Sequence, residues 1–381
     1  MAKGHSLRQS MCVVELDADD VYEVEAALDN FKELELDGDE VNPDNFRLPS
    51  LHARLDLAAK SVHRSGGLAV IRGLDPAKYS VEDNTIMFLG ISSYIGNQRG
   101  IQNPKGLVLS HVTELKSWTT PRERRHGIHT NRELPFHTDM GCSILAMHVR
   151  SRASSGGELC LVSSEAIHKD LQETDPEILT TLQTADWPVQ VAGQRPPYVL
   201  APLWQEHAGR LVVALDPARI GPHPAARAGL VPELRPAQLD ALAAVQKLAR
   251  QHQLRVASCT GDMVYLNNWS LLHGRDVYDD DALSARHVVR LWLHNTQLGW
   301  QVPPQMQAAW DAAFGFRALK VLNRYYPVAP LPQYMEPKYS NGTAAFVVDD
   351  DDESNDWSAA GGGLAPKVSP AARQEGEGPV L

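Results

Sequence analysis

The chain has 381 residues, of which 43% are hydrophobic and 22% charged, and its formal net charge is -11. This length allows one large domain or two smaller ones, and the composition is that of an ordinary globular protein. The acidic balance argues against a nucleic acid or an anionic membrane as partner, because both require a basic surface. No stretch has the apolar character of a signal peptide or a bilayer span, so we expect a cytoplasmic protein with a small-molecule substrate.

The cysteines give no sign of a disulfide framework or a thiolate metal site. They stand far apart in the sequence, and no two of them form a C-x-x-C pair; they are Cys12, Cys142, Cys160 and Cys259. Disulfide scaffolds and zinc sites use closer and more regular spacing. We therefore expect thiols buried in the core.

The first predicted elements are a helix, a strand and a second helix. Apolar residues recur at helical spacing over 51–62, between a Pro-Ser pair and a Gly-Gly pair. The next run, 68–74, is rich in β-branched residues and closed by turn formers, which predicts a buried strand. Ser80 and Asp83 have the spacing of a helix start, and this helix is expected to reach about Ile95.

Beyond residue 144 the pattern changes to short apolar runs separated by Gly, Pro and Asp. The predicted strands are 144–149, 159–162, 198–204, 211–215, 263–266 and 287–293. Repeated short strands predict a sandwich or barrel. Two stretches with helical spacing, 165–182 and 236–252, are expected to be insertions between the strands.

The composition also suggests how the chain is divided. Residues 1–45 are expected to be an N-terminal extension, and 46–335 a single domain with helical insertions. An acidic run at 349–353 is followed by Gly, Ala, Ser and Pro. Such a composition cannot bury a core, so 347–381 is predicted to be disordered.

A histidine and an aspartate two residues apart form the first candidate metal site. They are His137 and Asp139, in the segment Leu134-Pro-Phe-His-Thr-Asp-Met. In an extended strand, residues two apart point to the same side and can converge on one ion. The same spacing recurs in His168-Lys-Asp170, but that copy lies in a predicted helix, where positions two apart diverge. We interpret the second copy as solvated surface.

His273, just beyond a predicted strand, offers a third ligand. Two histidines and one carboxylate on one face of an ion are typical of non-haem Fe(II) oxygenases, which leave the other positions open. A co-substrate and dioxygen can take those positions. Zinc would accept the same ligands but has no redox chemistry.

An arginine pair on a later strand favours the oxygenase interpretation. In residues 286–293, strand alternation places Arg286, Val288 and Arg290 on one face. Buried arginines are costly unless an anion compensates, and the guanidinium fork matches a carboxylate. A dicarboxylate co-substrate that chelates iron at one end would supply this anion.

These residues resemble the taurine/2,4-D dioxygenase-like (TauD/TfdA) family of 2-oxoglutarate-dependent oxygenases. The resemblance extends over about 68–295 and is carried by four segments, which are 134–139, 156–158, 267–275 and 286–293. It implies a fold that is mainly β with flanking helices, around a double-stranded β-helix (jelly-roll, clavaminate synthase-like) core. It also implies Fe(II), 2-oxoglutarate as co-substrate, and O2.

The resemblance assigns roles to individual residues. His137, Asp139 and His273 would bind the metal and form the catalytic centre, and Arg286 would bind the distal carboxylate of 2-oxoglutarate. Arg290 would lie beside it and serve either co-substrate or substrate. An internal ion pair with an acid is an equal alternative for Arg290.

One position departs from the family pattern. The family commonly has Thr or Ser directly after the Gly-Gly-acid element, where its hydroxyl binds the 2-oxoglutarate carboxylate, whereas this chain has Leu159. Neither Cys160 nor Ser163 can be assumed to replace that hydroxyl. We therefore expect an altered affinity or orientation of 2-oxoglutarate.

Residues for the substrate are harder to select. Phe136 precedes the first ligand and is a candidate contact. The basic segment 121–132 is either a solvated loop or part of a mobile lid, over 98–132, in which Arg132 could meet a substrate carboxylate. Trp269 and Trp292 are interpreted as core residues, because aromatic residues in strands are mostly packed.

The expected reaction couples oxidative decarboxylation of 2-oxoglutarate, which yields succinate and CO2, to oxidation of a substrate C–H bond. Hydroxylation, desaturation and cyclisation all remain open, as do amino acids, small acids and natural-product intermediates as substrates. Two other hypotheses compete with this one. The first is a catalytically silent jelly-roll protein that binds metal and 2-oxoglutarate, and the second is a zinc hydrolase. The oligomeric state cannot be read from the sequence.

Overall fold

The computed structural model describes residues 11–64, 66–103, 105–191, 196–222, 229–319 and 324–334. The predicted tail at 347–381 lies outside these residues. The helices are α2 (Ala18–Glu33), α3 (His52–Arg64), α4 (Val81–Ile95), α5 (Ser164–Thr174), α6 (Pro176–Gln183), α7 (Pro236–His252), α8 (Gln307–Phe314) and α9 (Phe316–Leu319). The strands up to the second helical insertion are β1 (Cys12–Glu15), β2 (Leu68–Arg72), β3 (Gln98–Arg99), β4 (Leu109–Thr113), β5 (Leu134–His137), β6 (Ile144–Ser151), β7 (Ser155–Gly156), β8 (Leu159–Ser163), β9 (Trp187–Gln190), β10 (Tyr198–Ala201), β11 (Trp204–His207) and β12 (Arg210–Val213). After it follow β13 (Leu254–Val256), β14 (Met263–Asn267), β15 (Leu271–Arg275), β16 (Tyr278–Asp279) and β17 (His287–His294).

Two sheets form the framework of the described structure. The larger has the order β1-β2-β14-β6-β17-β3, with β4 also paired to β17, and the smaller has the order β13-β8-β15-β5. The β1–β2 pair is parallel, whereas the other pairs in these two sheets are antiparallel. Neighbouring strands in the sheets come from distant parts of the sequence, as in a jelly roll. The mainly β fold with flanking helices is therefore confirmed.

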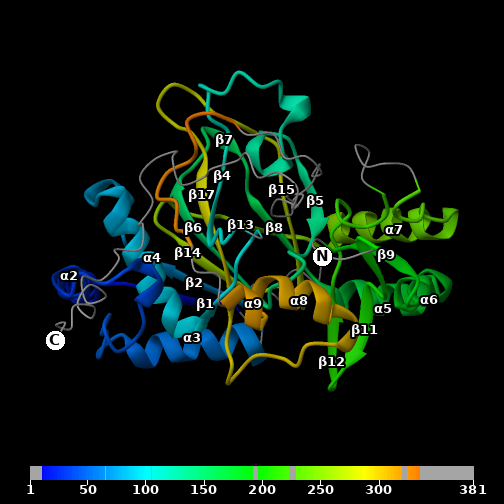
Figure 1. The fold of residues 1–381 in the computed structure, drawn as a ribbon, viewed down its shortest axis with the longest axis horizontal. Helices are drawn as coiled ribbons and strands as arrows, with labels where there is room; N and C mark the ends of the chain where they lie inside the picture. The colour runs from blue at the N-terminus through cyan, green and yellow to red at the C-terminus, as the bar shows by residue number, and fades with distance from the viewer. Residues whose placement is uncertain are drawn as a thin grey trace, which may run out of the picture.

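Each face of the larger sheet packs against a different layer. In β2, Leu68 and Val70 join the core cluster shared with the smaller sheet, whereas Ala69 and Ile71 join the cluster under the N-terminal helices. This division follows the strand period of two. Figure 1 shows α2, α3 and α4 on one side of the β framework and α5, α6 and α7 at the opposite end.

Most predicted elements are confirmed, with differences at their boundaries. The predicted strand 198–204 is two strands, β10 and β11, and the predicted helix 165–182 is two helices, α5 and α6. The second break has a clear cause, because Asp175 caps α6 through Ile178 N and Pro176 occupies its first turn. Residues 11–45 belong to the same body as the sheets, since β1 pairs with β2 and Phe31 of α2 is buried in their shared core.

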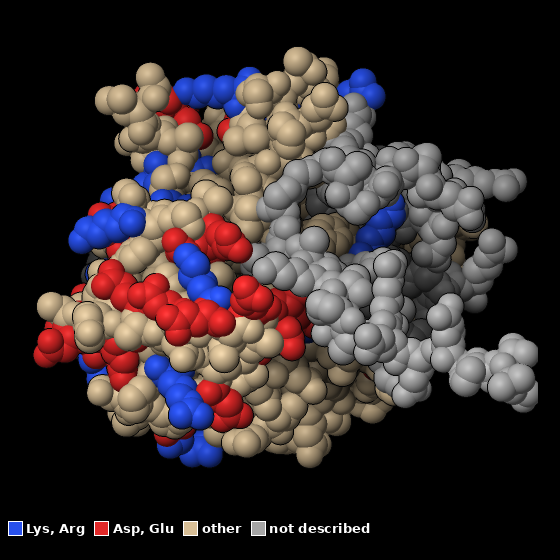
Figure 2. Space-filling model, turned by 60° about the vertical axis from the view of Figure 1, so that its left-hand side comes forward, with Lys and Arg blue, Asp and Glu red and all other residues tan. Residues whose placement is uncertain are grey.

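Two further observations concern the surface and membrane spans. Figure 2 shows acidic side chains gathered across one face of the molecule, in keeping with the net charge of -11. Among the described helices, none combines the length and the apolar character needed to cross a bilayer.

Candidate metal centre

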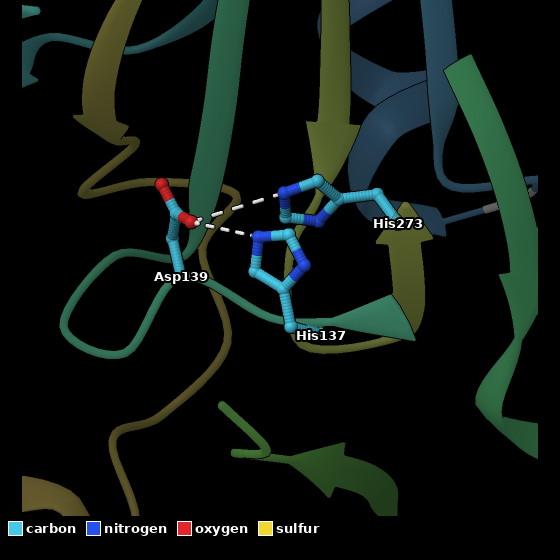
Figure 3. A group of neighbouring side chains, drawn as sticks. All are labelled: His137, Asp139 and His273. Atoms are coloured by element: carbon cyan, nitrogen blue, oxygen red, sulfur yellow. Dashed lines mark ion pairs between the residues drawn. The ribbon is translucent and has the colours of Figure 1, made fainter. Parts of the chain in front are cut away.

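The two predicted histidine ligands are neighbours across a strand pair. His137 ends β5 and is the direct antiparallel partner of His273 in β15. Residues opposite one another in such a pair point to the same side, and the ring centroids of these two lie 4.1 Å apart. Asp139 follows two residues after His137, on the loop that leaves β5. Figure 3 shows both imidazoles directed at its carboxylate.

The three side chains form a compact set of donor atoms. Asp139 Oδ1 lies 3.6 Å from His137 Nε2 and 3.8 Å from His273 Nε2. All three ligand atoms lie within 4.8 Å of one another. Within the described part of the chain, no other three His, Cys, Asp or Glu side chains bring their ligand atoms so close. The second H-x-D copy, on α5, is not part of such a group.

Hydrogen bonds leave the correct atoms facing the centre. His137 Nδ1 lies 2.8 Å from the Pro135 carbonyl, so this nitrogen donates the proton and Nε2 keeps its lone pair. Asp139 Oδ1 is buried and has no hydrogen-bond partner among the residues that the structure describes. A buried carboxylate oxygen without a partner is costly, and a divalent cation beside it would remove that cost. The donor set therefore fits a metal ion.

The second oxygen of Asp139 is held by two side chains of β17. Trp292 Nε1 donates to Asp139 Oδ2 at 2.7 Å, and Arg290 Nη1 lies 3.0 Å from the same oxygen. Burial alone would raise the pKa of Asp139, but Arg290, followed by the two histidines, holds that pKa below its ordinary value. The carboxylate is thus fixed in its ionised form, with Oδ1 directed towards the histidines.

Burial also keeps His273 in the form that binds metals. It lowers the pKa of His273 well below its ordinary value, and the neighbouring His137 lowers it further. As whole residues, His137, Asp139 and His273 are 3%, 1% and 7% exposed. A neutral imidazole and an ionised carboxylate are the states that coordinate a divalent ion.

Asn268 fixes the backbone of the ligand loop. Its Oδ1 accepts from the Asp139 amide at 2.8 Å, and its Nδ2 donates to the carbonyls of Asp139 and Cys142 at 2.7 and 2.8 Å. The loop from Asp139 to Cys142 is therefore tied to the turn that connects β14 and β15. This connection sets the position of the third ligand relative to the two strand histidines.

Arg286 lines a pocket in which none of the three candidate ligands is a lining residue. Gly157, Leu159, Met147 and Val288 line this pocket with it. Arg286 Nε donates to the Gly157 carbonyl at 3.3 Å, whereas Nη1 is buried and has no partner. Leu159, the position at which the sequence departs from the expected family pattern, is one of the residues that line this pocket.

Arg290 is brought to the metal centre itself. Besides its ion pair with Asp139, its Nε donates to Gln102 Oε1 at 2.9 Å. The ion-pair alternative for Arg290 therefore describes the arrangement found here. The expectation that Arg286, Val288 and Arg290 share one strand face is consistent with these positions, because Val289 and Leu291 lie in the opposite core cluster.

The two other substrate candidates do not face the metal centre. Phe136 alternates with His137 along β5, so its ring packs in the core, and its backbone pairs with the Gln246 side chain. Arg132 is exposed and its Nη2 lies 2.8 Å from Glu123 Oε1. The structure thus assigns neither residue a place next to the three ligands.

The basic segment 121–132 makes internal ion pairs. Arg125 Nη1 and Arg122 Nε both lie within 3 Å of Glu114 Oε1, at 2.9 and 2.5 Å. Arg275 Nη2 donates to the carbonyls of Thr130 and Gly127, at 2.8 and 3.5 Å. The C-terminal part of the segment is therefore anchored to β15.

Sequence reasoning missed two residues that position Asp139. Trp292 was expected to be core, and it is buried, but its indole N–H binds the ligand carboxylate. The alternation that placed Arg290 on the inner face of β17 also places Trp292 there, so the signal was present. Asn268 had no comparable signal, because its role depends on a turn brought from a distant part of the sequence.

Comparisons with known proteins agree with this geometry. The family model described as "Taurine catabolism dioxygenase TauD, TfdA family" matches residues 30–292. The taurine hydroxylase-like protein SAT17 of Stachybotrys chartarum (strain CBS 109288 / IBT 7711) is 35% identical over 311 residues, which cover 79% of this chain and 80% of that protein.

Solved structures show the same fold at low sequence identity. An asparagine oxygenase has a TM-score of 0.54 at 13% identity, and covers 76% of this chain and 98% of its own. The non-heme iron oxygenase OrfP has a TM-score of 0.52 at 18% identity, and covers 74% of this chain and 94% of its own. With the family match extending over most of the chain, the conclusion is direct: this protein belongs to the TauD/TfdA family of dioxygenases.

Proposed function

We propose that this chain binds Fe(II) through His137, Asp139 and His273 and uses 2-oxoglutarate and O2 to oxidise a C–H bond of a small molecule. The observation that carries the proposal is the buried Asp139 Oδ1, which has no hydrogen-bond partner and faces two imidazole nitrogens. Family membership supports the reaction class. When bound, Fe(II) and the co-substrate together supply the activation of dioxygen.

The residues around the ligands set the geometry of the centre. Trp292 and Arg290 hold Asp139 Oδ2, which leaves Oδ1 as the oxygen that would bind the ion. Ligation by one oxygen leaves positions on the metal open for other groups. Partners of this kind around a metal ligand typically affect metal affinity by about 10–100-fold.

Arg286 is the proposed partner of the distal carboxylate of 2-oxoglutarate. Its Nη1 is buried without a partner, and burial lowers the pKa of its guanidinium. A buried cation without an acid is stabilised by an anionic ligand. Met147, Leu159 and Val288 give the pocket an apolar wall, against which the methylene groups of the co-substrate can pack.

The substrate is proposed to be a small amino acid, a related small acid or a natural-product intermediate. The similar solved structures include an asparagine oxygenase with 3-hydroxyasparagine and succinate, and OrfP with L-Arg. The reaction outcome depends on how the substrate lies relative to the metal, so hydroxylation is proposed first, with desaturation and cyclisation as other outcomes of the same chemistry.

We also propose one oxygenase domain over 46–335, to which the strand and helix of residues 11–45 are joined. A cytoplasmic location fits the four cysteines, which are free thiols; Cys142 and Cys160 are buried as expected, whereas Cys12 is half-buried and Cys259 is exposed. Disulfides are rare in that compartment.

The test is the release of succinate and CO2 from labelled 2-oxoglutarate by the Fe(II)-loaded protein, with and without O2 and with a panel of amino acids and small acids. The proposal predicts O2-dependent succinate that rises with a true substrate and disappears in Asp139→Ala. Binding of 2-oxoglutarate without succinate would indicate a silent binding protein. Substrate turnover that continues without O2 would indicate a hydrolase.

A further inference from the structure

Two arginines, the buried Arg275 and the half-buried Arg286, share one aromatic ring, and Arg286 also lines the pocket described above. The guanidinium carbons of Arg275 and Arg286 lie 5.0 and 5.5 Å from the centroid of the Tyr278 ring. Arg275 is only 5% exposed. Arg275 follows His273 by two residues in β15, whereas Arg286 directly precedes β17. The ring of Tyr278 therefore brings two cations from separate strands to one place.

Both guanidinium groups keep donors that nothing in the described structure accepts. Arg275 uses Nη2 for the carbonyls of the 127–132 segment, but its Nε and Nη1 are buried without a partner. Arg286 uses Nε for Gly157, and its Nη1 is likewise without a partner. Asp280 is the nearby acid: its Oδ1 accepts from the backbone amide of Arg286 at 2.9 Å, and its charge favours both guanidinium groups. Among the described residues, neither guanidinium forms an ion pair with its side chain or with that of another acid.

Each positive charge increases the free-energy cost of burying the other. Arg275 is buried, and Arg286 lies over the same aromatic ring, so each positive charge disfavours the other. Tyr278 offers only the face of its ring, which offsets part of this cost. Buried like charges with spare donors are the arrangement that an anion stabilises most, because it satisfies the N–H groups and the repulsion together.

We propose that Arg275 acts with Arg286 in binding the distal carboxylate of 2-oxoglutarate, with the Tyr278 ring as the platform that holds both guanidinium groups. This inference rests on the proposed function. It also accounts for Leu159, because a second guanidinium supplies the donor that the family's hydroxyl would provide. The carboxylate then accepts from two arginines rather than from one arginine and one hydroxyl.

The experiment is a pair of anaerobic calorimetric titrations of the full-length Fe(II)-loaded protein. One ligand is 2-oxoglutarate, and the other is 2-oxobutanoate, which keeps the chelating keto acid but lacks the distal carboxylate. Arg275→Gln removes the charge and keeps an N–H donor for the carbonyls of the 127–132 segment. We expect this substitution to weaken the binding of 2-oxoglutarate by about 10-fold or more, as for the loss of a charge-assisted hydrogen bond. The dissociation constant of 2-oxobutanoate should change less than about twofold, since it makes no such bond.

Two further variants separate recognition from folding. Arg275→Lys restores the charge, so it should recover part of the lost 2-oxoglutarate affinity. Arg255→Lys alters an exposed arginine paired with Asp276 and should leave the affinities for both keto acids unchanged. If Arg275→Gln does not fold, the same comparison is made with Tyr278→Leu, which removes the platform and should also weaken 2-oxoglutarate selectively.

The results that overturn the inference are distinct from those that overturn the proposed function. If Arg275→Gln lost equal affinity for both keto acids, Arg275 would only anchor the 127–132 segment. If it lost no affinity for either, Arg275 would have no role in the pocket. Either result leaves the 2-oxoglutarate assignment intact. Failure of the unmodified protein to bind 2-oxoglutarate would overturn both.

Discussion

His137 and His273 are direct cross-strand partners on β5 and β15, with ring centroids 4.1 Å apart. Backbone hydrogen bonds between the strands therefore set the distance between two of the three proposed ligands. The third, Asp139, lies on a loop and has no such support from the sheet. Its position depends on side chains from β17 and from the turn before β15, and several predictions concern these contacts.

Metal binding should depend on His273 and not on the second H-x-D copy. His273→Ala removes one of three ligands, so the protein should retain far less than one Fe(II) per chain after anaerobic dialysis. His168→Ala is the matched control and should retain Fe(II) as the parent does, because His168 lies on α5. Metal content measured by mass spectrometry checks both, and equal loss in the two variants would contradict the site.

Trp292 should contribute to metal affinity through a single hydrogen bond. Trp292→Phe keeps the aromatic ring and removes the N–H that donates to Asp139 Oδ2. We expect Fe(II) affinity to fall by about 10-fold or more, as for other partners of metal ligands. The control is Trp269→Phe, since the Trp269 indole N–H is buried without a partner. A competition titration with a chelating dye measures both, and an unchanged affinity in Trp292→Phe would refute the role.

Asn268 should stabilise the fold even without metal. Asn268→Ala removes three buried hydrogen bonds to the ligand loop. We expect the free energy of unfolding of the metal-free protein to fall by about 3 kcal/mol. Asn30→Ala, on the exposed side of α2, removes one exposed hydrogen bond and should cost less than about 0.5 kcal/mol. Urea denaturation measures the two, and similar losses would argue against a special role for Asn268.

Stability should fall at mildly acidic pH because of a histidine pair near the basic segment. His111 Nδ1 and His287 Nε2 lie 2.7 Å apart, and burial lowers the pKa of His111 to about 4 and that of His287 to about 3. The unfolded histidines titrate near 6.5, so below that pH the unfolded chain binds more protons than the folded one. The stabilising contribution is complete above about pH 6.5 and is lost as the pH falls towards 4.

Each histidine of this pair should lower the free energy of unfolding by about 1.4 kcal/mol for each pH unit below about pH 6.5. Urea denaturation at pH 7.5 and 5.5 measures the decrease. The double variant His111→Gln, His287→Gln should show a smaller decrease than the parent. An identical decrease in both proteins would mean that other groups cause the acid sensitivity.

The sequence predicted which three side chains come together, because most of the evidence for them is local. His137 lies on a predicted strand, and His273 stands at the end of a recognisable apolar run. The strand ends at His137, however, so the predicted strand spacing does not extend to Asp139, which lies on the following loop. Arg286 and Arg290 followed from the same alternation. The alternation did not decide between the alternatives for Arg290, because its ion pair with Asp139 depends on which segment packs opposite β17.

Other features depend on contacts that a linear pattern does not contain. Phe136 is an exception: strand alternation along β5, which the sequence contains, already places its ring on the side opposite His137, in the core. Asn268 and Arg275 act on loops brought near them by the sheet topology. The break between α5 and α6 could have been predicted, because Asp175 and Pro176 are typical of a helix start.

The central claim is that Arg286 and the three ligands together bind Fe(II) and 2-oxoglutarate. The most direct measurement is an anaerobic titration of the Fe(II)-loaded protein with 2-oxoglutarate, followed by the visible metal-to-ligand absorption band. The account predicts a saturable band in the parent, a much weaker affinity in Arg286→Ala, and no band in Asp139→Ala. Absence of the band in the parent would contradict the metal and co-substrate site, and an unchanged affinity in Arg286→Ala would contradict the role of that arginine.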